Sequence, residues 1–206
     1  MNDKIVILDY KMGNLNSVKK KFDRLGANVI ISSKKEDVLS AGKLILPGVG
    51  HFGIAMDSLR DLDLIKPLNE AVLINKTPVL GICLGMQIMT KRSDEGDVEG
   101  LGWLDAEVVK FKVSDSLKFK VPHTGWNQVE NLKISKLMMN VPDKSEFYFV
   151  HSYHVKLGDS LLGLNSTEYE TPFTSAFEKG NIYGVQYHPE KSHDVGTLLL
   201  ENFMKL

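Results

Sequence analysis

The feature that most constrains the fold is a short apolar run that ends in a glycine-flanked cysteine and continues as a helical pattern. It covers residues 79–87, in which Gly81 and Gly85 flank Cys83, the only cysteine of the chain. A strand-to-helix turn this sharp leaves no room for side chains beside the central residue, which explains both glycines. The first N–H groups of the helix point towards the sulfur and favour its thiolate. The sequence therefore predicts a nucleophile at a strand-to-helix corner; the alternative is a buried, unreactive thiol.

A second stretch supplies the two groups that a thiolate nucleophile needs. A strand-like run over residues 182–187 delivers His188 at its end, and Glu190 follows across Pro189, which fixes the local backbone. A nucleophile needs a general base and the base needs an orienting group, and the three have to be adjacent only in space. Alone, His188 would be an ordinary loop histidine and Glu190 a solvated charge. Together with Cys83 they predict a Cys–His–Glu triad.

Composition narrows the class of protein. The chain has 206 residues, of which 43% are hydrophobic, so we expect one sizeable core and one domain over residues 1–206. Lys and Arg (25) nearly balance Asp and Glu (26), which favours neither a nucleic-acid nor a membrane partner. The N-terminus lacks a signal-peptide pattern and no run approaches the roughly 18 to 20 apolar residues of a spanning helix, so a cytoplasmic protein is expected. No Cys/His cluster has zinc-like spacing, and neither a metal nor a cofactor is expected.

The order of the patterns predicts an α/β fold. The first half alternates apolar, strand-like runs with helical periodicity, as expected of a parallel sheet that helices cover on both faces. The expected strands are residues 5–8, 29–31, 44–46 and 79–83, and the expected helices are residues 15–25, 37–41, 52–59 and 64–72.

The second half has a different texture. It opens with an acidic, glycine-bearing stretch at residues 93–100, which is expected to be an exposed loop. A hairpin signal lies at residues 179–181, and a helix is expected over residues 195–203. Short strand-like runs cover residues 106–111, 127–129, 146–150, 154–156, 174–177 and 182–187. This order favours one mixed, mostly parallel central sheet flanked by helices, with a β-rich C-terminal half, over two domains.

Three further stretches carry groups suited to a site. Residues 47–50, Pro-Gly-Val-Gly, follow an apolar run, and glycines around one residue let a peptide plane turn and present N–H groups to an anion. Residues 121–127 place a histidine, a tryptophan and an asparagine in a turn-rich segment, and residues 147–154 end an aromatic strand in polar side chains. Ligands usually bind at such strand ends in α/β proteins. The alternatives are an ordinary strand-to-helix turn and core packing.

The two catalytic stretches resemble the signatures of the class I (triad) glutamine amidotransferases. They are Gly81-Ile82-Cys83-Leu84-Gly85-Met86-Gln87 and Gly184-Val185-Gln186-Tyr187-His188-Pro189-Glu190. Further motifs resemble those of one branch, the glutaminase subunits of imidazole glycerol phosphate synthases. These motifs lie at residues 9–15, 46–50, 122–127, 149–153 and 188–192. The resemblance covers the chain end to end and implies a single class I glutamine amidotransferase domain.

The resemblance implies a role for each site residue. Cys83 attacks the carboxamide carbon of glutamine, His188 protonates the departing ammonia and later activates water, and Glu190 orients the imidazole. The oxyanion hole is expected from backbone N–H groups at Val49, Gly50 and Leu84. Residues expected near the substrate glutamine are Gln87, His151, Ser152 and Tyr153. The face expected to meet a partner bears Asn14, Trp126, Tyr148 and Lys191.

A partner is also implied. In this family, ammonia is channelled to a (β/α)8-barrel synthase subunit of a heterodimer, which makes imidazole glycerol phosphate and an aminoimidazole carboxamide ribotide in histidine biosynthesis. This chain departs from the pattern at Lys11, where glycine is common, and at Trp103, where the residue is usually smaller or aliphatic.

Three alternatives remain at this stage. Because Lys11 lies in a loop expected to face the partner, a paralogue that supplies ammonia for amidination of a nucleotide-linked sugar is the first. The second is a stand-alone Cys–His–Glu hydrolase on a related scaffold. The third is a non-catalytic binding subunit with a relict site.

Overall fold

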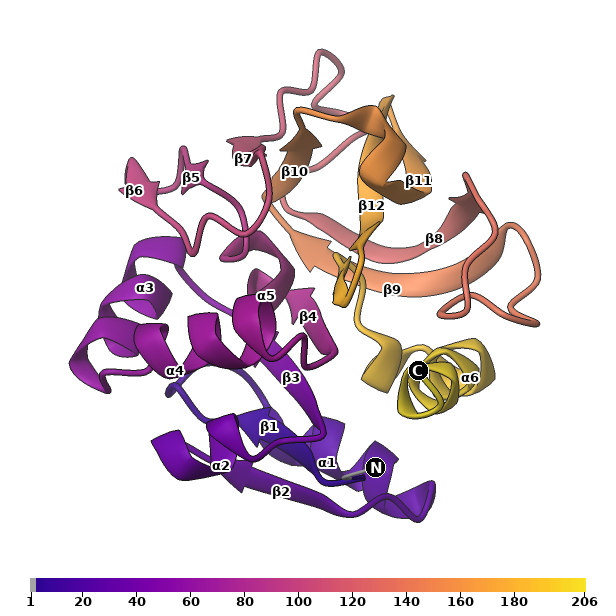
Figure 1. The fold of residues 1–206 in the computed structure, drawn as a ribbon. Coiled ribbons are helices and arrows are strands. Elements are labelled where there is room, and N and C mark those ends of the chain that lie inside the picture. Colours follow the sequence, from indigo (N-terminus) through magenta and orange to yellow (C-terminus); the bar gives the residue numbers. More distant parts are fainter. Residues whose placement is uncertain (1–2) are drawn as a thin grey trace.

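The chain folds into a mixed β-sheet with helices on both faces (Figure 1). The structure is a computed structural model, and it describes residues 3–206. One part of the sheet is parallel and contains strands that are buried along their length, which is why their sequences are continuous apolar runs. In spatial order these strands are β2 (Val29–Ser32), β1 (Ile5–Leu8), β3 (Lys43–Gly48), β4 (Val79–Cys83) and β13 (Ile182–Val185).

Beyond β13 the sheet becomes mainly antiparallel, so the predicted mixed sheet with a β-rich C-terminal half is confirmed. The predicted hairpin is present, because Lys179 pairs with Ile182 across its turn. The sheet continues through β12 (Thr171–Lys179), β10 (Tyr153–Leu157), β7 (Ala106–Lys110), β5 (Arg92–Ser93) and β6 (Val98–Glu99). A branch from β12 consists of β11 (Gly163–Tyr169), β8 (His123–Asn131) and β9 (Ser145–His151).

Helices cover both faces of the parallel strands (Figure 1). One face carries α2 (Lys35–Leu39), α3 (Phe52–Asp61), α4 (Ile65–Asn69) and the π-helical turn η1 (Glu70–Ile74). The other carries α1 (Leu15–Arg24) and α6 (His193–Met204), together with β8 and β9. The remaining short elements are α5 (Leu84–Gln87) and the 3-10 turns η2 (Ser160–Leu162) and η3 (Pro189–Lys191). Side chains of β3 alternate between the two cores, since Leu44 and Leu46 enter one and Ile45 the other.

The structure differs from the sequence prediction in four places. The helix expected over residues 64–72 is split into α4 and η1. Most of the stretch expected to be turn-rich, residues 121–127, belongs to strand β8, which begins at His123. The stretch 93–100 is only partly a loop, because β5 and β6 pair there and Ser93 is fully buried. Strand β11 was not predicted. None of the helices formed by residues 3–206 is both long and apolar enough to cross a lipid bilayer.

Candidate active site

Cys83 lies at the predicted strand-to-helix corner, as the last residue of β4 directly before α5. Its φ of 55° is in the left-handed region, which is strained for a residue with a side chain. The flanking glycines are required by close backbone contacts: a Cβ on Gly85 would lie 1.6 Å from the Leu46 carbonyl oxygen, and one on Gly81 would lie 2.6 Å from the Gly85 oxygen. The turn is therefore in close contact with β3, and it fixes the sulfur at the C-terminal end of the central strand β4.

His188 and Glu190 lie beside this turn because β13 is the parallel neighbour of β4. The imidazole Nδ1 and the Glu190 Oε1 are 2.8 Å apart, and the two side chains are 3% and 5% exposed. The backbone of His188 is held by a hydrogen bond from its N–H to the Tyr148 carbonyl. Its Nε2 is buried without a hydrogen-bond partner among residues 3–206, and the ring interacts with Cys83. The three residues predicted as a triad are thus brought together, with one ring nitrogen available for proton transfer.

The charge state of His188 is set by competing effects. Burial disfavours the imidazolium, but the interactions with Cys83 and Glu190 outweigh it and raise the pKa of His188 to about 9. Because the pKa is higher in the folded chain than the usual value of about 6.5, the protonated ring stabilises the fold fully below about pH 6.5. This contribution is lost as the pH rises through about 9.

We expect the Cys83→Ala variant to lower the pKa of His188, because the substitution removes a partner that favours the charged ring. The measurement is a pH titration of the histidine ring resonances by NMR in both proteins. His154 is an internal control, since burial lowers its pKa without a contribution from Cys83, and its titration should be the same in both. An unchanged titration of His188 in the variant would contradict the pairing.

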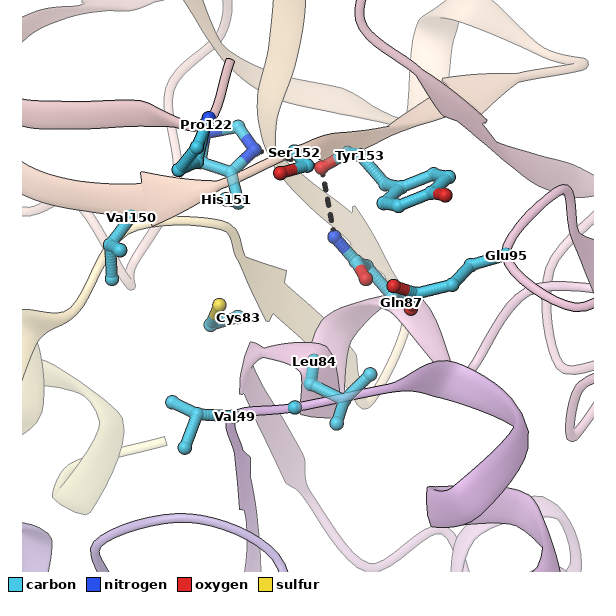
Figure 2. Close-up of a pocket in the computed structure, with 11 residues that line it drawn as sticks. Val49, Cys83, Leu84, Gln87, Glu95, Pro122, Val150, His151, Ser152 and Tyr153 are labelled. Carbon is cyan, nitrogen blue, oxygen red and sulfur yellow. Dashed lines mark hydrogen bonds between the residues drawn. The ribbon is translucent and has the colours of Figure 1, made fainter.

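Cys83 opens into a cavity of about 270 Å³. Figure 2 shows the cysteine with Val49 and Leu84 on one side and the segment from Val150 to Tyr153 on the other. The structure therefore gathers the residues expected at the oxyanion hole and at the substrate around one sulfur. The full lining is Val49, Gly50, Cys83, Leu84, Gln87, Glu95, Pro122, Val150, His151, Ser152 and Tyr153.

The amide nitrogen of Gln87 is already occupied by protein groups. It donates to the Tyr153 carbonyl at 3.0 Å, the bond drawn in Figure 2, and to Oε1 of Gln186 at 2.9 Å. His151 is also held by the protein, because its Nδ1 bonds the same carbonyl at 2.8 Å. Burial lowers the pKa of His151 to about 3, so the ring is neutral at physiological pH. Both side chains are thus fixed before any ligand binds.

Sequence reasoning missed two residues of this site, Glu95 and Gln186. Glu95 belongs to the stretch expected to be a solvated loop, yet it lines the cavity and accepts a hydrogen bond from the Phe52 N–H at 2.8 Å. An acidic loop carries no signal that distinguishes an inward carboxylate from outward ones. Gln186 was visible only as part of a motif, and it is fully buried next to Cys83.

The residues expected at a partner interface form a second group. The rings of Trp126 and Tyr148 are 5.9 Å apart at an angle of 71°, and the Lys191 Nζ lies 5.4 Å from the centre of the Tyr148 ring. Trp126 is 45% exposed, which is unusual for so large an apolar side chain. Asn14 caps α1 by accepting from the Ser17 N–H, and it lines a small cavity together with Lys191. That cavity is also lined by His188 and Glu190, so Asn14 and Lys191 lie beside the predicted triad.

The two departures from the family pattern have different physical meanings. Lys11 has a φ of 64°, a conformation that glycine adopts without strain, and its side chain is exposed. Trp103 is 3% exposed and donates from Nε1 to Asn69 at 2.7 Å, so it is a core residue. Of these two side chains, only that of Lys11 is exposed.

Comparisons with known proteins agree with this site. Residues 6–206 match the protein family described as "Glutamine amidotransferase class-I". The chain therefore belongs to the class I glutamine amidotransferases. A crystal structure of a glutamine amidotransferase aligns with a TM-score of 0.74, covering 97% of this chain and 98% of that one, at 18% identity, which shows the shared fold.

Curated relatives are closer. The chain is 52% identical to "Imidazole glycerol phosphate synthase subunit HisH 2" of Methanococcus maripaludis, over 98% of each chain. It is 47% identical to "Imidazole glycerol phosphate synthase subunit HisH 1" of Campylobacter jejuni, over 98% of this chain and 100% of the relative. A second protein of M. maripaludis, subunit HisH 1, is 40% identical over 98% of this chain and 99% of the relative.

Proposed function

We propose that this chain is the glutaminase subunit of an imidazole glycerol phosphate synthase. It hydrolyses glutamine to glutamate and ammonia, and the ammonia passes to a (β/α)8-barrel synthase subunit of a heterodimer. The observation that carries the proposal is Cys83 beside the hydrogen-bonded His188–Glu190 pair, at the wall of one small cavity. The near full-length similarity to the HisH subunits supports the acceptor reaction, which yields imidazole glycerol phosphate and an aminoimidazole carboxamide ribotide in histidine biosynthesis.

The geometry supports a two-step mechanism. The Cys83 sulfur attacks the carboxamide carbon of glutamine, and His188 gives its proton to the leaving nitrogen as the C–N bond breaks and ammonia departs. Water, deprotonated by His188, then hydrolyses the glutamyl thioester and restores the thiol. Glu190 keeps the ring oriented throughout. Backbone N–H groups at Val49, Gly50 and Leu84, all at the cavity wall, would bind the oxyanion.

Substrate recognition follows from the lining of the cavity. A volume of about 270 Å³ suits a single amino acid better than a peptide, which argues against the stand-alone peptide hydrolase. The carboxylate of Glu95 is placed to pair with the α-ammonium group of glutamine. The other proposed contacts to glutamine come from His151, Ser152, Tyr153 and the side-chain carbonyl oxygen of Gln87. Asn14, Trp126, Tyr148 and Lys191 are the proposed partner contacts.

The proposal treats residues 1–206 as one glutamine amidotransferase domain that needs neither a metal nor a cofactor. It also includes a cytoplasmic location. A reducing compartment suits a chain whose cysteine must stay a free thiol to react.

A different ammonia acceptor is the second candidate. M. maripaludis has two subunits named HisH, and this chain is closer to the second, at 52% against 40% identity. Lys11 adds a charge to a loop expected to face the partner, and a charge at an interface selects among partners. The amidination of a nucleotide-linked sugar is therefore retained as an alternative use of the same glutaminase.

We expect the chain, mixed with a histidine-pathway barrel subunit, to support product formation from glutamine. The experiment measures glutamate release and imidazole glycerol phosphate together, with the Lys11→Gly variant alongside. Equal activity of both chains would make Lys11 incidental. Product from ammonium salts but not from glutamine, with rescue by Lys11→Gly, would favour the alternative acceptor. Glutamine hydrolysis by neither chain, with any barrel, would contradict the glutaminase itself.

A further inference from the structure

Gln186 connects the catalytic sulfur to the protein interior. Its Nε2 donates to the Cys83 Sγ at 3.6 Å, and its Oε1 accepts from Gln87 at 2.9 Å. Its own N–H donates to the Ser175 carbonyl at 2.8 Å, and the residue is fully buried. We propose that Gln186 is a further catalytic residue, whose amide orients the Cys83 sulfur towards the cavity and stabilises its thiolate. The catalytic role rests on the proposed glutaminase function, whereas the interaction between Gln186 and the sulfur does not.

The direction of this amide is determined by a backbone carbonyl. The Tyr153 oxygen can only accept, so Gln87 has to present its NH₂ group to it. The second hydrogen of that group points to Gln186, which has to present its carbonyl oxygen there. The NH₂ group of Gln186 therefore faces the sulfur. A reversed Gln186 amide would place its NH₂ group against the NH₂ group of Gln87, which sets two donors against each other at a buried site.

Two hydrogen-bonded histidines, His123 and His151, also fix the Tyr153 carbonyl. Tyr153 O accepts from His151 Nδ1 at 2.8 Å, so the Nε2 of that ring is left as an acceptor. The Nδ1 of His123 lies 3.2 Å from it and is the donor, and its own Nε2 accepts from Asn127 at 3.3 Å. Burial lowers the pKa of His123 to about 4 and that of His151 to about 3, so neither ring is charged at neutral pH. The Tyr153 carbonyl therefore accepts from two arms, His151 on one and Gln87 on the other, and from Gln87 donation continues through Gln186 to the sulfur.

The sulfur needs such a donor. Helix α5 has only four residues, so its dipole supports a thiolate less than the sequence suggested. A hydrogen bond to the charged form of a group favours that form, and the effect is larger where water is excluded. Cys83 is 5% exposed, so the amide of Gln186 replaces solvent that cannot reach the sulfur freely.

The test is the pH dependence of alkylation of Cys83 by iodoacetamide, followed by intact mass on the full chain. We expect Gln186→Met to raise the alkylation midpoint by about one pH unit, because the variant loses the hydrogen bond that favours the thiolate. Gln186→Glu keeps the shape of the side chain and puts a carboxylate against the sulfur, so its midpoint should rise further. Gln128→Met is the matched control, because Gln128 is exposed on β8, and its profile should match that of the unaltered chain.

A Gln186→Met profile that coincides with the unaltered one, in protein with unchanged circular dichroism, would overturn the proposal. A second measurement needs no substitution of Gln186. Labelling with ¹⁵N-glutamine gives side-chain amide signals from three residues, Gln87, Gln128 and Gln186. In a pH titration, the chemical shift of the Gln186 amide should change with the same midpoint as the alkylation of Cys83. In the Cys83→Ala variant, this change should be absent. A signal that does not follow the titration would also overturn the proposal. Neither measurement uses glutamine as a substrate, so failure of the proposed glutaminase would not be confused with failure of this inference.

Discussion

Cys83→Ala should lose glutamine hydrolysis by at least about ten-thousandfold, because no other group in the cavity can form the thioester. The fold should remain, since the substitution removes one sulfur atom and leaves the glycine-flanked turn unchanged. The measurement is glutamate release by the complex of the variant with its barrel partner.

Two controls accompany this variant. Product formation from ammonium salts should be retained by the complex, because the barrel subunit uses ammonia directly. In the unaltered chain, a glutamine-mimicking electrophile should label Cys83 in a peptide map as activity disappears. Complete loss of glutamine turnover with the label on a different residue would show that the nucleophile has been misassigned.

The largest expected effect on stability is that of Gly85→Ala. An alanine Cβ at this position would lie 1.6 Å from the Leu46 carbonyl oxygen, so the corner would have to move away from β3. We expect a loss of at least about 3 kcal/mol in the free energy of unfolding, or no native fold at all. Urea unfolding followed by circular dichroism measures this change.

Gly53→Ala is the matched control for Gly85→Ala. Gly53 lies in α3, where an added Cβ would meet its nearest neighbours at 3.4 Å. Because alanine favours a helix over glycine by up to about 1 kcal/mol, this variant should be as stable as the unaltered chain or slightly more so. Equal stability of the two alanine variants would mean that the turn is not in contact with β3 as described.

The parallel part of the fold could be predicted because burial on both faces leaves a continuous apolar run in the sequence. Strand β11 could not, since its sequence Gly-Leu-Asn-Ser-Thr-Glu-Tyr has no such run. It becomes a strand by pairing with β12 on one side and β8 on the other. Local preference carries no record of that pairing.

The candidate site, like the fold, could be predicted only in part. Cys83 and His188 follow apolar runs, so the sequence placed both at strand ends; Cys83 does end β4, whereas β13 ends at Val185, before His188. Only the pairing of β4 with β13 makes the ends of these two strands neighbours. Glu95 depends on the short β5–β6 pair, which turns its loop inwards. The role of Gln186 depends on three distances between side chains and backbone that are far apart in sequence.

The position of strand β13 in the sequence has a consequence during synthesis of the chain on the ribosome. It is parallel to β4 and antiparallel to β12, so it joins the two parts of the sheet, and the proposed base, His188, follows it in the chain. Its residues, 182–185, are synthesised after those of β4, so the cysteine emerges before the histidine that lies beside it. A nascent chain that has emerged only as far as β4 therefore holds Cys83 without the other two members of the proposed triad.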